Sequence, residues 1–379
     1  MLDPIVAFMT RMFAALGRGI GLGLSFLLRP FVWMTSWYTK RGWIVRGAVG
    51  ALLLGLVVWY GAFFWQTQRW NGFNPDYATA YKFVPAAAGT GNDESADATA
   101  DAGAASAGGV CRASSIVTVT ADLIDFNVNQ NAWISSTLAY KMGFFGVDWD
   151  HTPFMDNKAS FQRGVNQALR RTTVELVDTL GRVRGTSQVD GDLQSARGAL
   201  QFDESTWYIG ISPPGPKTPT PSFYRQAEKD LQAFNARMVD CSATFNPRGD
   251  NLLQFLDRIA GDLGSTSDIL RDRSDNYSAV WFDTRADDRF WFTYGQLYAY
   301  HGILHATSAD FHDVIETRGL RPLWDKMEQQ LRSSLNVQPF IISNGEESGW
   351  IMPTHLATIG FYVLRVRSNI VEMRSVLDR

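Results

Sequence analysis

The sequence predicts an all-α protein with a single N-terminal transmembrane helix, a flexible linker and a soluble helical bundle. Three observations carry this prediction. One stretch lacks charged side chains, a later one almost lacks large apolar side chains, and beyond both the apolar residues recur at steps of three and four. That last period is typical of helices that bury one face. We therefore divide the chain into residues 1–46, 47–65, 66–110 and 111–379.

Residues 47–65 read GAVGALLLGLVVWYGAFFW and form the predicted transmembrane helix. A helix rises about 1.5 Å per residue, so this stretch spans roughly 28 Å, close to the hydrocarbon thickness of a bilayer. Lys40, Arg41 and Arg46 precede it, whereas only Arg69 follows it closely. The positive-inside rule then predicts a cytoplasmic N-terminus and a C-terminal domain outside the cytoplasm. The alternative is a buried helix of a soluble core.

One face of this predicted helix carries small residues. Gly47, Ala51 and Gly55 recur every four residues, so a second helix could approach closely along that face. The pattern suggests a homodimer through these three positions. Small residues are also common in membrane helices that do not associate, which leaves a monomeric helix as the alternative.

Charge is distributed unevenly along the chain. Residues 1–70 carry seven Lys or Arg and one acidic residue, a balance of +6, and residues 71–379 carry 28 basic and 37 acidic residues, a balance of −9. A basic N-terminal segment suits an anionic membrane leaflet. The acidic remainder argues against nucleic-acid binding, which requires a basic face. The expected partners are therefore the lipid bilayer and proteins of the cell envelope.

The first 46 residues are basic and amphipathic. Arg11, Arg18 and Arg29 fall on one stripe of a helix, opposite apolar side chains, which is typical of a helix lying in the membrane interface. Residues 4–28 are also apolar enough to form a second membrane segment, and the sequence leaves both alternatives open. A cleaved signal peptide is not expected, because the charged region before the span is too long.

Residues 66–110 are interpreted as a juxtamembrane region followed by a flexible linker. The linker, AAAGTGNDESADATADAGAASAGGV, cannot bury enough apolar surface to offset the entropy of ordering. The chain has two cysteines, Cys111 at the start of the bundle and Cys241 after a predicted helix. An oxidising compartment would permit a disulfide between them, and two buried free thiols are the alternative.

Apolar spacing predicts five helices in the bundle, near residues 157–180, 221–238, 252–263, 286–316 and 356–377. Asn157 is the expected N-cap of the first. The last has an unbroken heptad seam, formed by Leu356, Ile359, Val363, Val366, Ile370, Met373 and Leu377. Such a seam fits a core helix of an antiparallel bundle or a coiled coil between chains. The proline-rich residues 211–221 are expected to form an extended surface loop.

His301 and His305 are the candidate metal ligands. They are four residues apart in the segment HGILH, so they share one face of a predicted helix and could bind one ion. Gly302 replaces the glutamate of the zinc-protease motif HExxH. His312 falls on the same stripe but about 16 Å along the helix axis. Polar positions in a helical bundle are the alternative interpretation of the histidine pair; nearby oxygen ligands would be Asp310, Asp313 and Glu316.

Asp283, Asp287 and Asp288 cluster at a predicted helix start. Paired carboxylates can serve acid–base chemistry, but negative charge at this place also complements the helix dipole. The sequence contains no phosphate-binding loop, no dinucleotide fingerprint and no nucleophile elbow. We therefore assign no catalytic residue and no cofactor-binding residue.

Two segments resemble a bacterial family of uncharacterised membrane proteins, domain of unknown function 2333. They are DDRFWFTYGQLYAY, at residues 287–300, and MPTHLATIGFYVLRVRSNIVEMRSVL, at residues 352–377. The resemblance covers most of residues 50–379. It implies a Gram-negative envelope setting, and it implies no established activity, catalytic residue or cofactor.

Together these features favour a non-enzymatic protein anchored in the bacterial inner membrane. The N-terminus is expected in the cytoplasm and the bundle in the periplasm, where it would act as a scaffold or bind a protein partner. The alternative is a periplasmic metal-binding or metal-dependent hydrolytic module that uses His301 and His305. The two differ in whether the purified protein carries a stoichiometric metal ion.

Overall fold

The structure, a computed structural model, describes residues 12, 25–26, 28–30, 32–83, 111–182, 188–211, 213–277, 283–345 and 352–379. It divides into two compact units, Met1–Ala62 and Phe63–Arg379. Nearly all regular structure is helical, which confirms the predicted all-α class. The predicted interfacial helix or second membrane segment at residues 4–28 lies almost entirely outside the described residues, and so does the predicted linker at residues 86–110.

Helix α2 (Trp43–Gln68) contains the predicted span, and its last turn belongs to the second unit. Within the described residues it is the one helix long and apolar enough to cross a membrane. Its side chains are mostly exposed up to the last turn, where Phe63 and Thr67 are buried. A Cβ atom added at Gly47 or Gly55 would meet no described atom within 4 Å. The small-residue face is therefore open, and the homodimer stays a prediction.

The second unit is a bundle of long helices: α3 (Ser115–Asp125), α5 (Asn157–Glu175), α6 (Gly191–Leu200), α7 (Thr220–Val239), α8 (Gly249–Tyr277), α9 (Ala286–Asp310), α11 (Arg321–Leu335) and α12 (His355–Leu377). Shorter helical elements connect them: α4 (Leu138–Met142), α10 (His312–Thr317), the 3₁₀ turns η1 (Tyr77–Ala80), η3 (Ile134–Ser136) and η4 (Trp149–His151), and the π-helical turns η2 (Phe126–Gln130) and η5 (Leu176–Leu180).

Three boundaries differ from the sequence-based expectation. Asp156, and not Asn157, occupies the N-cap position of α5. The helix predicted at residues 286–316 breaks at Phe311, so His312 begins a separate helix. The proline-rich loop begins with an antiparallel pair of strands, β1 (Ile209–Ile211) and β2 (Pro214–Pro216). Prolines are tolerated there because both strands of a two-stranded pair are edges.

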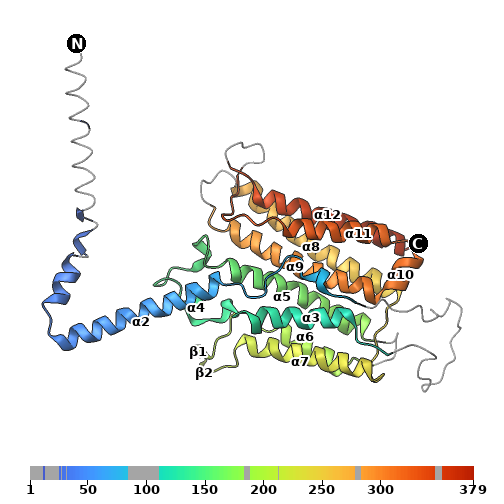
Figure 1. Ribbon diagram of the computed structural model, residues 1–379, viewed down its shortest axis with the longest axis horizontal. Helices are drawn as coiled ribbons and strands as arrows, with labels where there is room; N and C mark the ends of the chain where they lie inside the picture. The colour runs from blue at the N-terminus through green and yellow to red at the C-terminus, as the bar shows by residue number, and fades with distance from the viewer. Residues whose placement is uncertain are drawn as a thin grey trace, which may run out of the picture. The chain divides into compact units, whose positions relative to one another are not determined.

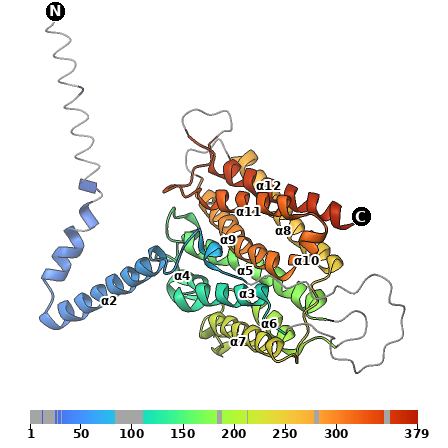
Figure 2. The same cartoon turned by 45° about the vertical axis from the view of Figure 1, so that its right-hand side comes forward.

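The long helices form two groups that meet where α5 crosses α9 (Figure 1). Helices α8, α9, α11 and α12 lie together on one side, and α3, α5, α6 and α7 lie on the other, in both views (Figure 2). Two glycines allow the close crossing. A Cβ atom at Gly164 would lie 1.9 Å from the carbonyl oxygen of Phe292, and one at Gly295 would lie 2.1 Å from that of Phe161. Any larger residue would therefore force the two backbones apart.

Helix α12 buries its heptad seam inside this bundle. All seven seam residues are buried, and α12 packs against α8 and α11. The off-seam Leu364 and Val371 remain exposed. The bundle arrangement therefore accounts for the seam within one chain, and a coiled coil between chains remains unconfirmed.

Residues 69–83, which we call the strap, follow α2 and pack along α9. Tyr77 stacks on Tyr298 with ring centroids 4.4 Å apart, and its hydroxyl donates to the Tyr298 carbonyl oxygen at 2.8 Å. The same hydroxyl accepts from the Gly302 N–H at 3.1 Å. Phe73 also stacks on Tyr298, at 5.5 Å. The second unit therefore begins well before the predicted boundary at residue 111.

Cys111 and Cys241 are joined in the structure, with Cα atoms 5.4 Å apart. Cys241 directly follows α7 and its C-cap residue, and its φ angle is 60°. The bridge therefore ties the entry of the bundle to the end of α7. Its oxidation state in the cell stays a prediction.

Candidate functional site

The predicted histidine pair lies on α9, but its two members have different surroundings. His301 is buried, and its Nδ1 has no hydrogen-bond partner. Burial lowers the pKa of His301 to about 4. His305 is partly exposed, and its Nδ1 lies 3.4 Å from Oε2 of Glu328. That hydrogen bond raises the pKa of His305. The two imidazoles are therefore expected to differ in charge in mildly acidic solution.

The other candidate ligands near this pair have different roles. Asp310 accepts from the Ser114 hydroxyl and from the N–H groups of Ser115 and Ile116, at 2.7 to 3.0 Å, and so caps the start of α3. His312 Nδ1 lies 3.2 Å from an Arg321 nitrogen. Among the described residues, no group of three candidate ligands within 4.8 Å of one another includes His301 or His305, so metal binding by this pair stays a prediction.

Three carboxyl groups come together elsewhere, at the starts of α5 and α9. Asp150 belongs to η4, Asp156 precedes α5, and Asp288 lies in the first turn of α9. One oxygen of each lies within 4.8 Å of the others, the only such group among the residues that the structure describes. We call these three residues the aspartate cluster. The close crossing of α5 and α9 brings its members together.

The hydrogen bonds within the aspartate cluster are incomplete. Asp288 accepts from the Ser160 hydroxyl at 2.6 Å, and Asp150 accepts from the Tyr140 hydroxyl at 3.2 Å. Asp156 is 0 % exposed, and neither of its carboxyl oxygens has a hydrogen-bond partner. It occupies the N-cap position of α5 without accepting from the first turn. An isolated buried carboxylate is costly, so this group requires a proton or a neighbouring cation.

The pKa shifts of these carboxyl groups support the same conclusion. Burial raises the pKa of Asp156 well above its ordinary value, and the carboxyl groups of Asp288 and Asp287 raise it further. Burial also raises the pKa of Asp288. Asp287 lies beside the cluster, and burial followed by the charge of Asp288 raises its pKa to about 7. The region therefore holds more carboxyl groups than it can keep ionised at neutral pH without added positive charge.

A buried lysine lies close by in the sequence and joins the bundle to the end of α2. Lys158 is buried, and its Nζ donates to the carbonyl oxygens of Gln66 and Arg69 at 2.9 and 2.7 Å. The last carbonyls of a helix lack partners within it and carry the negative end of its dipole. Lys158 therefore caps α2, although burial lowers its pKa to about 8.

Other contacts complete this connection, which we call the joint and define as residues 63–68 with the side chains that hold them. Phe63 packs against Trp149, with ring centroids 5.1 Å apart. The Gln68 side chain donates to the Phe154 carbonyl oxygen at 2.9 Å. The last turn of α2 is therefore built into the second unit.

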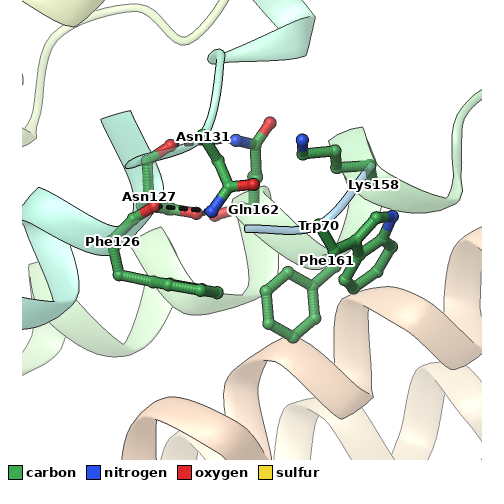
Figure 3. A pocket seen from close by; sticks show the side chains of 7 residues that line it. All are labelled: Trp70, Phe126, Asn127, Asn131, Lys158, Phe161 and Gln162. Atoms are coloured by element: carbon green, nitrogen blue, oxygen red, sulfur yellow. Dashed lines mark hydrogen bonds between the residues drawn. The ribbon is translucent and has the colours of Figure 1, made fainter. Parts of the chain in front are cut away.

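A crevice beside the joint is filled by packing (Figure 3). It is lined by Trp70, Phe126, Asn127, Asn131, Lys158, Phe161 and Gln162, and it is too narrow to admit a water molecule. Asn127 and Gln162 exchange two bonds, each side-chain amide donating to the other residue's carbonyl oxygen, at 3.0 and 2.9 Å. The crevice therefore provides rigidity and no substrate pocket.

Only part of this region could be predicted from the sequence. Asp287 and Asp288 are predicted to cluster with Asp283, but Asp283 pairs with Arg273 instead. No sequence-based prediction includes Asp150, Asp156 or Lys158. The available signal is the segment DWDHTPFMDNK, at residues 148–158, which runs into the start of the predicted helix and in which aspartates recur without a regular motif spacing.

A helical bundle attached to one long apolar helix defines the class of protein. Within that class, the chain belongs to the family described as uncharacterized protein conserved in bacteria (DUF2333), whose model matches residues 120–280 and 272–379. This confirms the resemblance seen in the two C-terminal segments. No curated protein and no solved structure matches the chain significantly. The matched regions include the aspartate cluster and Lys158.

Proposed function

We propose that this protein is a scaffold of the bacterial inner membrane, in which α2 crosses the bilayer and the bundle stands in the periplasm and binds envelope proteins. The observation that carries the proposal is the joint. A membrane helix that only tethers a soluble domain needs no contacts with that domain. Here, however, the bundle buries and caps the last turn of α2. That construction suits a protein that must hold a binding surface near the membrane.

Two further observations support the proposed location. The positive charges before α2 favour a cytoplasmic N-terminus. The pairing of Cys111 with Cys241 suits an oxidising compartment such as the periplasm. The surroundings of the histidine pair favour a scaffold over the hydrolytic alternative, because His301 is buried and no third candidate ligand groups with both histidines among the described residues.

Topology is tested by fusing reporters after residue 379. A reporter that works only outside the cytoplasm should be active, and one that works only inside should be inactive. The cysteines give a matched readout, since they should resist maleimide in unreduced, denatured protein and react after reduction. A cytoplasmic reporter signal together with two reactive thiols would contradict the proposed location.

The scaffold role is tested by cross-linking in intact cells with three forms of the full chain: wild type, Lys158→Met and Lys229→Met. Lys158→Met removes the cap of α2, whereas Lys229 is an exposed lysine on α7 and serves as the matched control. We expect wild type and Lys229→Met to capture the same envelope proteins and Lys158→Met to lose them while remaining folded and membrane-bound. Unchanged partners in Lys158→Met, or none in wild type, would oppose the proposal.

A further inference from the structure

We propose that Asp150, Asp156 and Asp288 form a binding site for one hard divalent cation of the Ca²⁺ and Mg²⁺ class. The proposal does not depend on the scaffold role. It rests on the geometry of three carboxyl groups and on the absence of hydrogen-bond partners for the most buried one. Each of these two observations is independent of the other.

The first observation is the spacing of the oxygen atoms. Two oxygens bound to one ion can be no farther apart than twice the metal–oxygen bond, which is about 4.2 Å for Mg²⁺ and about 5 Å for Ca²⁺. The three carboxyl oxygens of the aspartate cluster lie within 4.8 Å of one another. A single ion can therefore contact all three with little movement, and the longer bonds of Ca²⁺ fit more readily.

The second observation is Asp156 itself. It is 0 % exposed, both of its oxygens lack partners, and one oxygen lies among those of Asp150 and Asp288. Buried polar groups are almost always hydrogen-bonded, and the buried Asp262 and Asp310 of this chain each accept several bonds. Only Asp287, beside the cluster, shares with Asp156 the lack of a partner for both oxygens among the described buried aspartates. A bound cation would supply the positive charge that the missing donors do not.

The donor set determines the class of ion. The cluster offers carboxylate oxygens, with the hydroxyl oxygens of Ser160 and Tyr140 beside them. All-oxygen ligand sets suit Mg²⁺, Ca²⁺ and Mn²⁺, whereas zinc and copper sites usually include nitrogen or sulfur ligands. Asp150 and Asp288 are partly exposed and give the ion a path from solvent.

Nearby positive charge offsets the cluster only in part: Arg163 and Arg289 both act to lower the pKa of Asp288, but burial still leaves that pKa raised. Arg163 donates to the Tyr140 hydroxyl at 3.4 Å, and its guanidinium lies over the Tyr140 ring at 5.5 Å. It forms an ion pair with Glu204, at 3.9 Å. Its charge is therefore shared with a carboxylate outside the cluster, and Asp287 adds a further acidic group.

The site is tested on the purified full chain in detergent after treatment with a chelator. Ca²⁺, Mg²⁺ and Mn²⁺ are titrated separately by calorimetry. Tb³⁺ then serves as a luminescent substitute for Ca²⁺, because Trp149 and Tyr140 are close enough to excite it. We expect saturable binding of one ion per chain, Tb³⁺ emission that Ca²⁺ reverses, and a rise in Tm with added Ca²⁺.

Three variants provide the comparison. Asp156→Asn keeps the side-chain volume and should weaken Ca²⁺ binding by at least about tenfold, and Asp150→Asn should do the same from a partly exposed position. Asp148→Asn is the matched control, since Asp148 is exposed on the same loop and outside the cluster. It should bind Ca²⁺ like wild type.

Stability without metal separates a cation site from a merely structural cluster. In chelator, Asp156→Asn should be at least as stable as wild type, because it removes an unpaired buried carboxyl group. Added Ca²⁺ should raise the Tm of wild type and of Asp148→Asn only. The proposal is overturned if wild type binds none of the three ions, or if Asp156→Asn and Asp150→Asn both gain the same Tm shift as wild type.

Discussion

The middle of α9 and the start of α9 each face a buried aspartate, but the two carboxyl groups have opposite surroundings. Near the middle, Asp262 of α8 accepts from the side chains of Gln167, Arg171, Gln296 and Tyr300. Near the start, Asp156 accepts from none. Both side chains are buried. Burial alone therefore does not reveal what a polar residue does; its donors do.

Substitution of Asp262 should give the largest effect. Asp262→Ala leaves a partly buried guanidinium, two amides and a phenol without their acceptor, so we expect a loss of about 3 to 5 kcal/mol in the free energy of unfolding. Thermal and denaturant unfolding of the full chain measure it. Asp268→Ala, at an exposed position of α8, should change stability by less than about 0.5 kcal/mol. If Asp262→Ala and Asp268→Ala lost similar amounts of stability, the donors around Asp262 would not be stabilising, and Asp262 would no longer contrast with Asp156.

His301 and His305 on α9 show the same contrast between an unpaired and a paired side chain, and the pH dependence of stability should reveal it. The pKa of His301 is about 4 in the folded protein and 6.5 in the unfolded chain, so the unfolded chain binds more protons between these two pH values. The stability that neutral His301 contributes is therefore complete above pH 6.5 and falls as pH drops toward 4. Between pH 7.5 and 5, wild type should lose about 2 kcal/mol more than His301→Phe.

Parallel unfolding of wild type and His301→Phe at a series of pH values measures this difference. Other titrating groups are common to both proteins and cancel. His301 would prove to be solvated, and not buried and unpaired, if the two curves of stability against pH ran parallel.

The smallest effect belongs to the paired histidine. The side chains of His305 and Glu328 are 27 % and 25 % exposed, and such pairs contribute less than about 1 kcal/mol. The hydrogen bond raises the pKa of His305, so the contribution is complete below pH 6.5 and disappears as pH rises past the raised value. Glu328→Gln should therefore destabilise slightly at pH 6 and not at pH 9. If Glu328→Gln reduced stability equally at pH 6 and pH 9, the altered interaction would be the hydrogen bond from the Trp324 indole to Glu328 instead.

The parts of the fold that depend on local pattern could be predicted from the sequence. The heptad seam of α12 identifies its buried face because large apolar residues at that spacing must leave water. The joint and the aspartate cluster could not be predicted in the same way. Asp156 and Asp288 are far apart in the chain, and they meet only because Gly164 and Gly295 let α5 and α9 cross closely. A glycine inside a predicted helix does not indicate which other helix will pack closely against it.

The strap also changes what holds the end of α2 to the bundle. Residues 69–83 lie against α9 through Tyr77 and Phe73, and Lys158 holds the end of α2. Attachment through these contacts does not require an intact backbone between the strap and Cys111. Residues 1–83 and residues 111–379, produced as separate polypeptides, should therefore reassemble into one particle, as complementing fragments do. Conversely, a fragment that begins at residue 111 would expose the α9 surface around Tyr298 that the strap covers, and it should be prone to self-association.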